Sequence, residues 1–349
     1  MNQPQNQPSG FPSRNNPPPG IELSPLSHRS SRRAYFHDYR APGFYHLTAT
    51  VHPGSAPLSI ITSPPPETEI SGMIIPTHTP LGEKIKSEIL SISRFHPEMR
   101  ILRFVIMPDH LHIVLHVQKR LRRKLGSELA GFFGACSKHN TSFASLTEFK
   151  TLFQPFHDQI LFDSNQVDRA IKYVEDNPRR LLLKRKNPDL FRRYLHLVIS
   201  DHEYAAYGNI FLLKEIYLLP IRIHRRWTYT QVNEYTKKCL SEIEQGAVPI
   251  SPFIHPAEKA IMNKAIETGA RIIKLSDQGF EARFKPKGRD FDLCSEGRLL
   301  LLAPWPANYG RKSTAGYHEF HTMNDLAMAI ATLPSSTRFC IRNPSLPSK

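Results

Sequence analysis

Two strongly apolar segments separated by a short turn constrain the fold of this chain more than any other feature. Residues 101–107 read ILRFVIM and residues 110–117 read HLHIVLHV, and both are rich in the β-branched and other apolar residues typical of strands. Pro108 and Asp109, which lie between them, favour a turn. The sequence therefore predicts an antiparallel β-hairpin.

Periodic segments around this hairpin predict the rest of a small domain. Residues 44–51 (FYHLTATV) have the composition of a further strand. Residues 80–95 carry apolar side chains at helical spacing, which predicts an amphipathic helix. Residues 122–139 are expected to form another helix, which begins in a very basic stretch.

A last helix in this part of the chain has clear start and stop signals. Asp163 with Gln166 three residues later resembles a capping box. The helix is expected to end at Asn177, because Pro178 disfavours helical geometry in the residue before it. The succession of strand, helix, two strands and two helices predicts an α+β fold with helices packed on an antiparallel sheet.

Composition and pattern divide the chain into three parts. Residues 1–33 are rich in Asn, Gln, Ser and Pro and end in a basic patch, so we expect a disordered tail. Residues 34–205 hold the α+β domain. In residues 206–349 strands alternate with helices, starting with strands expected at 209–213 and 216–223. This alternation predicts a smaller, Rossmann-like α/β domain of uncertain role.

The charge balance favours a polyanionic partner. Lys and Arg number 46 against 31 Asp and Glu, which gives a net charge of +15. A merely soluble basic protein is the alternative. The four cysteines show no CxxC spacing, which argues against a structural zinc site and a disulfide framework. Because no apolar run could span a bilayer and no signal peptide is evident, we expect a cytoplasmic, nucleoid-associated protein without a membrane partner.

His110 and His112 form a candidate metal site. Alternate side chains of a strand point to the same face, so the two imidazoles can converge on one ion while Leu111 points away. His116 shares this face but lies farther along and is not expected to be a ligand. A hard divalent ion such as Mg²⁺ or Mn²⁺ held here would polarise a phosphate. For an isolated HxH pair, two ordinary strand histidines are the more common explanation.

Tyr173 and Asn177 are four residues apart and therefore share one face of the predicted helix. Ile171 and Val174 are expected to bury the helix, which leaves Tyr173 on its flank. The hydroxyl of Tyr173 could attack phosphorus while Asn177 offers its carbonyl oxygen to the same metal ion. Such chemistry needs a nearby cation, because an ordinary phenol has a pKa of about 10. From spacing alone, a tyrosine that serves packing is the simpler interpretation.

Two basic stretches are candidate contacts to a DNA backbone. They flank the histidine pair and the tyrosine in the sequence. Phosphate binding would explain them, and solvated helix faces are the alternative. The residues that we assign to this role are Lys119, Arg120, Arg122, Arg123, Arg179, Arg180, Lys184 and Arg185.

Two motifs resemble those of the single-tyrosine HUH transposases, and more closely their REP-associated subgroup. The motifs are MPDHLHIVL at 107–115 and YVEDNPRRLLL at 173–183. The resemblance extends to GFYHLTATV at 43–51 and FQPFHDQIL at 153–161, and covers roughly residues 34–205. It implies a sheet of the ferredoxin or RRM type with packed helices.

The resemblance also implies a role for each matched residue. His110 and His112 become the metal ligands, Tyr173 the nucleophile and Asn177 the third ligand, with Mg²⁺ or Mn²⁺ as the ion. His157 and Asp158 keep the family pattern and are expected to orient the site residues or to contact DNA. Two positions depart from the family, which often has tryptophan at Phe153 and histidine at Gln159.

The reaction implied by the resemblance is a transesterification on single-stranded DNA with a hairpin near the cut. Tyr173 attacks a phosphodiester and forms a 5′-phosphotyrosine link. A free 3′-hydroxyl leaves and later attacks such a link, which rejoins strands. Some relatives act as homodimers, so a homodimer is one expected assembly, and whether the tyrosine acts in its own chain or in a partner stays open.

The C-terminal part resembles the Rossmann-like core of DNA-processing protein A over residues 251–275 and 297–306. The glycines of a phosphate-binding loop are missing between Ser251 and Glu258, which argues against nucleotide binding there. Holding single-stranded DNA, mediating protein contacts and a purely structural role all stay open.

Three functions are compatible with these features. The first is a DNA transposase with metal-dependent strand cleavage and transfer. The second is a host-adopted protein that recognises DNA hairpins without moving itself. The third is an unrelated metal hydrolase that uses the HxH pair, for which Tyr173 would be dispensable.

Overall fold

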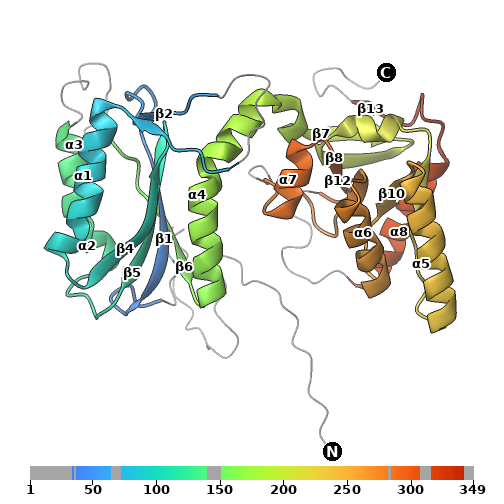
Figure 1. Cartoon of the computed structure of the whole chain (residues 1–349), viewed down its shortest axis with the longest axis horizontal. Helices are drawn as coiled ribbons and strands as arrows, with labels where there is room; N and C mark the ends of the chain where they lie inside the picture. Colours follow the sequence, from blue (N-terminus) through green and yellow to red (C-terminus); the bar gives the residue numbers. More distant parts are fainter. Residues whose placement is uncertain are drawn as a thin grey trace, which may run out of the picture. The chain divides into compact units, whose positions relative to one another are not determined.

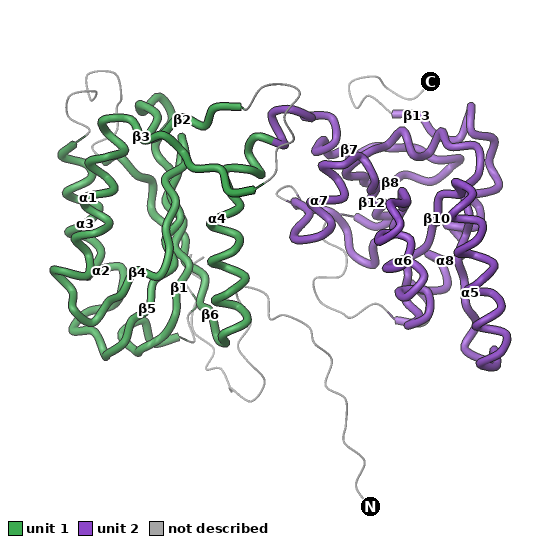
Figure 2. Tube along the Cα trace, viewed as in Figure 1, with its two compact units in different colours: residues 1–182 green, residues 183–349 purple. Residues whose placement is uncertain are grey.

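The chain forms two compact units, residues 1–182 and residues 183–349 (Figure 2). The computed structural model describes residues 34, 37–63, 72–139, 151–281, 284–306 and 316–341. The tail predicted for residues 1–33 lies outside the described residues.

The first unit is built on a four-stranded sheet with the order β4-β5-β1-β6. Every pair of neighbours in it is antiparallel. The predicted hairpin is confirmed as β4 (Met99–Ile106) and β5 (His110–Val117). The predicted first strand is β1 (Gly43–Thr50), and β6 (His157–Leu161) was not predicted as a strand. A separate two-stranded sheet joins β2 (Ser59–Ile60) to β3 (Thr77–His78).

Helices cover both faces of this sheet (Figure 1). α1 (Pro80–Phe95), α2 (Leu125–Glu128) and α3 (Ala130–His139) lie on one face, and α4 (Ser164–Lys186) lies on the other. α1 has the bounds that the apolar spacing predicted. Its start is fixed by Thr79, whose hydroxyl accepts a hydrogen bond from the Gly82 N–H at 3.1 Å.

The main core of the first unit lies between the sheet and α1 to α3. Alternate residues of the central strands enter it, because side chains alternate between the two faces of a strand. The buried strand residues are Leu47, Leu111, Ile113 and Leu115, and their helical partners in this core include Ile85, Ile89 and Phe132. The other residues of the same strands, among them the two histidines, therefore face α4. This α+β architecture agrees with the predicted fold class.

α4 continues through Pro178, so the prediction that this helix ends at Asn177 is wrong. Proline has no N–H and cannot donate to the carbonyl four residues earlier, that of Val174. The buried face of the helix continues beyond the proline to Leu182, and this packing compensates for the lost hydrogen bond.

The second unit is built on a seven-stranded sheet with the order β13-β7-β8-β12-β11-β10-β9. Four neighbouring strands are parallel: β9 (Leu218–Pro220), β10 (Val248–Ser251), β11 (Ile272–Leu275) and β12 (Leu299–Ala303). The other three are antiparallel to their neighbours: β7 (Arg193–Ile199), β8 (His202–Gly208) and β13 (Cys340–Ile341). The parallel part has the predicted Rossmann-like character.

Helices also pack on both faces of the second sheet. One core includes residues of α5 (Tyr229–Glu244), α6 (Pro256–Glu267) and α7 (Arg289–Ser295). The other core includes residues of α8 (Tyr317–Thr332). Because the parallel strands are covered on both sides, they are largely apolar, and Leu299–Ala303 (LLLLA) is entirely so.

The boundary between the units differs from the predicted one. The expected division after residue 205 falls inside β8, which belongs to the second sheet together with β7. The segment 209–213, expected to be a strand, falls largely within a 3-10 helix (Ile210–Lys214). Asn209 explains this, because its side chain accepts a hydrogen bond from the Phe211 N–H at 3.1 Å and starts a turn. A second 3-10 helix spans Pro188–Phe191.

All four cysteines are free thiols. In the part of the chain that the structure describes, no helix combines the length and apolar character needed to cross a membrane.

Candidate functional site

His110 and His112 lie at the start of β5, and the ring of His112 contacts Tyr173 of α4. Their ring centroids are 4.9 Å apart, with an angle of 84° between the ring planes. Across the sheet, His110 is opposite Thr50 and His112 is opposite Thr48 on β1. The strand alternation thus brings the two imidazoles together, as the sequence predicted.

Both imidazoles are held through Nδ1. His110 Nδ1 is 2.6 Å from the Asp109 carboxylate. His112 Nδ1 is 3.0 Å from the Thr48 hydroxyl and 3.1 Å from His46 Nε2. Histidines that bind metals usually donate one ring N–H to a neighbouring group, which orients the other nitrogen towards the ion. In both rings this other nitrogen is Nε2.

Burial keeps His112 in the neutral form that a metal ligand requires. The residue is only 5% exposed. Loss of solvent lowers its pKa to about 2, and the neighbouring imidazoles of His46 and His110 act in the same direction, while the Asp109 charge opposes them. His112 is therefore an uncharged imidazole throughout the physiological pH range.

Tyr173 reaches the histidines from α4. Its ring centroid lies 5.5 Å from that of His112 and 5.9 Å from that of His46. Val174 and Ala170 are buried on the packed side of the helix, whereas Tyr173 on its flank is 41% exposed. The phenol is thus next to the imidazole pair and open to solvent. This is an arrangement in which a large substrate could contact both groups.

Two further side chains of α4 surround the tyrosine. Asn177, one turn later, is 9% exposed and donates to the Tyr173 carbonyl. The Arg180 guanidinium lies 5.6 Å from the centre of the Tyr173 ring and 3.7 Å from the Asp176 carboxylate. Arg180 is only 9% exposed, so it is part of the tyrosine site rather than the surface DNA contact that the sequence suggested.

The donors present suit a metal ion that keeps open coordination positions. In the described ranges, no three His, Cys, Asp or Glu side chains are grouped so as to hold an ion. The donor set predicted from the sequence contains two imidazoles, which the structure brings together, and the amide oxygen of Asn177. Structural metal sites use closed sets of four protein ligands, whereas Mg²⁺ and Mn²⁺ sites leave positions for water and phosphate oxygens. The donor set therefore fits a divalent ion that acts on a phosphate.

The two residues expected to support the site lie on opposite faces of β6. His157 is opposite Thr48 and so shares the face of His112. Asp158 is opposite Leu47 on the other face, where it accepts a hydrogen bond of 2.6 Å from the Tyr39 hydroxyl. The structure therefore does not bring Asp158 to the histidine pair. This is a correction that follows from the strand alternation.

Sequence reasoning missed His46 and Thr48, which both contact His112. Both residues are in the predicted strand FYHLTATV, and Phe44, His46 and Thr48 alternate along one of its faces. That alternation was a usable signal. The signal that was lacking is the register between β1 and β5, because only the register shows which face meets the HxH pair.

The first basic stretch follows the end of β5 that is remote from His110. β5 has eight residues, of which His110 is the first, and a strand of this length spans about 25 Å. Lys119 and Arg122 are exposed there. Arg120 forms an ion pair with Asp38 at 2.8 Å, and Arg123 forms one with Glu128 at 3.4 Å. This stretch is therefore a surface at a distance from the tyrosine.

The second basic stretch is less uniform than its sequence suggests. The Arg179 guanidinium donates a hydrogen bond of 2.5 Å to the Asp176 carboxylate. The Lys184 ammonium lies 5.4 Å from the centre of the Phe291 ring in the second unit, and Arg185 is exposed. On the other side of the tyrosine, Arg169 and Lys172 are exposed on α4 within one turn of it.

In the second unit, the turn between β10 and α6 binds a carboxylate of the chain itself. Glu258 is 2% exposed, and its two oxygens accept hydrogen bonds from the Ile223, Ile254 and His255 N–H groups at 2.8, 2.9 and 3.1 Å. In Rossmann-like folds the N–H groups at such a helix start bind the phosphate of a nucleotide. Here Glu258 satisfies these donors, which explains in physical terms why the glycines are missing.

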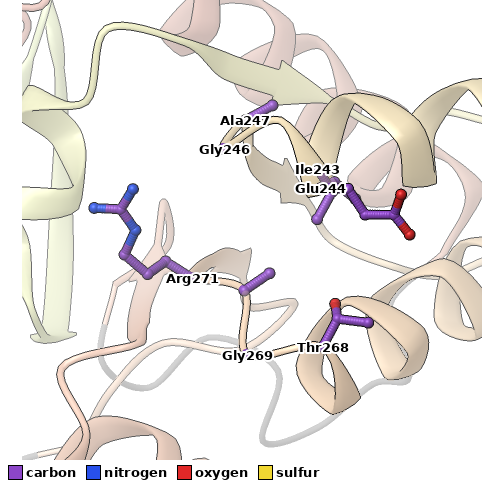
Figure 3. A pocket seen from close by; sticks show the side chains of 8 residues that line it. Ile243, Glu244, Gly246, Ala247, Thr268, Gly269 and Arg271 are labelled. Atoms are coloured by element: carbon purple, nitrogen blue, oxygen red, sulfur yellow. The ribbon is translucent and has the colours of Figure 1, made fainter.

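Cavities lie at both ends of β10 and β11, among the described residues of the second unit. One of about 320 Å³ is at the amino ends of β10 and β11, where Glu244, Thr268 and Arg271 line it (Figure 3). The other, of about 360 Å³, is at the carboxyl ends of the same strands, and Phe253 and Lys274 are among its lining residues. Neither cavity contains a residue that the sequence assigned to the site.

No protein-family model matches this sequence, and no curated protein sequence matches it. Among solved structures, the chain is similar to that of a REP-associated tyrosine transposase bound to a REP hairpin. The similarity covers 44% of this chain and 73% of the other, with 15% sequence identity and a TM-score of 0.26. Values this low carry no weight for function, which has to be inferred from the site itself.

Proposed function

We propose that this protein is a DNA transposase that cleaves and rejoins single-stranded DNA, with Tyr173 as the nucleophile. The observation that carries the proposal is the position of the Tyr173 ring, 5.5 Å from that of His112 and exposed to solvent. The site thus combines a nucleophilic oxygen with two imidazoles whose Nε2 atoms are available. This combination suits phosphoryl transfer to a side chain.

His110 and His112 would bind a Mg²⁺ or Mn²⁺ ion through Nε2, and Asn177 would add its amide oxygen. Such an ion acts as a Lewis acid on a phosphate oxygen. Asp109, Thr48 and His46 hold the two rings through Nδ1. The protein's part in the chemistry is therefore to orient the ligands and to place the phenol beside the phosphate.

The proposed reaction is a transesterification. The Tyr173 oxygen forms a bond to phosphorus, and the bond between phosphorus and the 3′ oxygen breaks. The phenolic proton is lost, the leaving 3′ oxygen gains a proton, and the 5′ side of the strand stays linked to Tyr173. In the reverse direction a 3′-hydroxyl attacks the phosphotyrosine and rejoins a strand. The Arg180 guanidinium beside the ring favours negative charge at this place.

The proposed substrate is a single strand with a hairpin near the cut. Exposed basic side chains on α4 beside Tyr173, and others beyond the far end of β5, would contact its phosphates. We assign this role to Lys119, Arg122 and Arg185 from the predicted set, and to Arg169 and Lys172 in addition. Such a substrate implies action on nucleoid DNA in the cytoplasm, by a monomer or a homodimer.

The test is formation of a covalent adduct. Purified protein would be incubated with Mn²⁺ and a labelled library of single strands that carry a hairpin with randomised flanks, and then analysed by denaturing electrophoresis. We expect a labelled protein band that Tyr173→Phe abolishes. Tyr229→Phe is the matched control, because Tyr229 is also exposed but lies in the second unit.

Two other outcomes would contradict the proposal and favour the hairpin-binding protein or the metal hydrolase instead. If the wild-type protein binds hairpins but forms no adduct, it is a hairpin-binding protein without transposition activity. If metal-dependent cleavage survives Tyr173→Phe, the histidine pair belongs to a hydrolase that does not use the tyrosine.

A further inference from the structure

We propose that His46 is a positioning residue that fixes the ring of His112 for metal binding and connects it to Tyr173. The inference rests on the proposed function, in which His112 is a metal ligand. It adds a third histidine, from a different strand, to a site that the sequence motifs limit to the HxH pair and the tyrosine helix.

The sheet register places His46 beside His112. Thr48 is directly opposite His112 on the neighbouring strand, and His46 is two residues further along β1 on the same face. The His46 and His112 ring centroids are 5.0 Å apart, and His46 Nε2 lies 3.1 Å from His112 Nδ1. Because both strands are central in the sheet, this geometry is set by backbone hydrogen bonds on both sides.

The hydrogen bonds select the metal-binding form of His112. A neutral imidazole carries one proton, and a metal ion needs the nitrogen without it. If Nε2 of His112 binds the ion, its Nδ1 must carry the proton and donate it. The His46 Nε2 lone pair and the Thr48 hydroxyl oxygen are both placed to accept that bond. With His46 as the acceptor, the Nδ1–H tautomer of His112 is stabilised and its Nε2 is left for a metal ion.

His46 also contacts the nucleophile. Its ring meets that of Tyr173 edge to face, with centroids 5.9 Å apart and planes at 70°. His112 meets the same ring at 5.5 Å and 73°. The three rings therefore form a closed triangle, in which His46 supports both the metal ligand and the phenol.

The experiment compares two substitutions of His46 with a matched control in the full-length protein. His46→Leu removes the acceptor but keeps an apolar side chain of similar bulk. His46→Gln keeps a polar atom near the position of Nε2 and can accept the same bond. His116→Leu is the control, because His116 lies on the same face of β5 but stacks on Phe44 instead of His112. Circular dichroism would verify that each variant is folded.

Mn²⁺ affinity, measured by titration calorimetry without DNA, is the main readout. Loss of a group that orients a metal-binding histidine weakens the affinity by about 10- to 100-fold. We expect a loss of this size in His46→Leu, recovery of most of it in His46→Gln, and no change in His116→Leu. Nitrogen NMR on ¹⁵N-histidine-labelled protein should show His112 as the Nδ1–H tautomer in the wild type and a mixture of tautomers in His46→Leu.

Failure of this inference can be told apart from failure of the proposed function. If His46→Leu binds Mn²⁺ as the wild type does, His46 has no positioning role, while the tyrosine adduct still tests the transposase. If the wild-type protein binds no Mn²⁺, or if His112→Ala binds it equally well, the metal site itself is wrong and both proposals fall.

Discussion

His110 and His112 are held by different kinds of partner. His110 Nδ1 is bonded to the carboxylate of Asp109, its exposed neighbour in the chain. His112 is buried, and its partners Thr48 and His46 come from another strand. A carboxylate on the ring nitrogen opposite the metal raises the basicity of the ligand and fixes its orientation. Asp109 should therefore matter for metal binding although it is not itself a ligand.

Asp109→Ala is expected to weaken Mn²⁺ binding by about tenfold, because His110 loses the acceptor that orients it. Titration calorimetry of the protein without DNA would measure the change. Asp38→Ala is the control, since Asp38 is also an exposed carboxylate but pairs with Arg120. Equal Mn²⁺ affinity in Asp109→Ala and Asp38→Ala would contradict a role for Asp109.

Single residues were predictable where their partners are close in sequence. The HxH pair, with Tyr173 and Asn177 on one helix face, follows from strand and helix periodicity within two short motifs. His46 depends on a register between strands that are about 65 positions apart in the chain, which no local pattern contains. Asp158 was assigned to the site because it keeps the family pattern, and only the pairing of β6 with β1 shows that it lies on the other face.

At the scale of elements, prediction succeeded where the pattern was long and uninterrupted. α1 and β5 have the predicted bounds, because one has a clear apolar stripe with a threonine cap and the other a continuous apolar run. It failed at α4, where packing on both sides of Pro178 outweighs the preference of proline to end a helix. β7 and β8 were not predicted. Their polar residues interrupt the apolar pattern, and their strand conformation is stabilised by pairing within the sheet.

The start of α6 gives a prediction at this scale. Glu258→Ala leaves three backbone N–H groups without their acceptor, and we expect a loss of about 2–4 kcal/mol in the stability of the second unit. Urea unfolding followed by tryptophan fluorescence measures this directly, because both tryptophans, Trp227 and Trp305, are in the second unit. Glu267→Ala, at the exposed end of the same helix, should change little. A similar midpoint for both variants would exclude the capping role.

At the scale of the whole molecule, the chain combines an α+β unit with a second unit of α/β character, and it carries a large positive net charge. The first unit has an antiparallel sheet with the candidate site on one face. The second has a mainly parallel sheet whose usual phosphate-binding turn is closed by Glu258. The net charge of +15 is consistent with a polyanionic substrate of the first unit without implying a nucleotide in the second.

Binding of single-stranded DNA should accordingly be strongly salt-dependent. Removing two phosphate contacts by the double substitution Arg169→Gln and Lys172→Gln should reduce the slope of log affinity against log salt by about 1.4. Fluorescence anisotropy of a labelled strand over a KCl series gives this slope. The double variant Lys84→Gln and Lys237→Gln removes the same charge from α1 and α5. If both pairs change the slope equally, α4 has no special contact with the strand.

The hydrogen bonds that hold the two imidazoles are part of the fold itself. A ligand pair that is already in place loses little conformational freedom on capture, so association needs no refolding of the sheet. If the proposed site binds a hard divalent cation, the arranged pair should bind it more tightly than a flexible pair would.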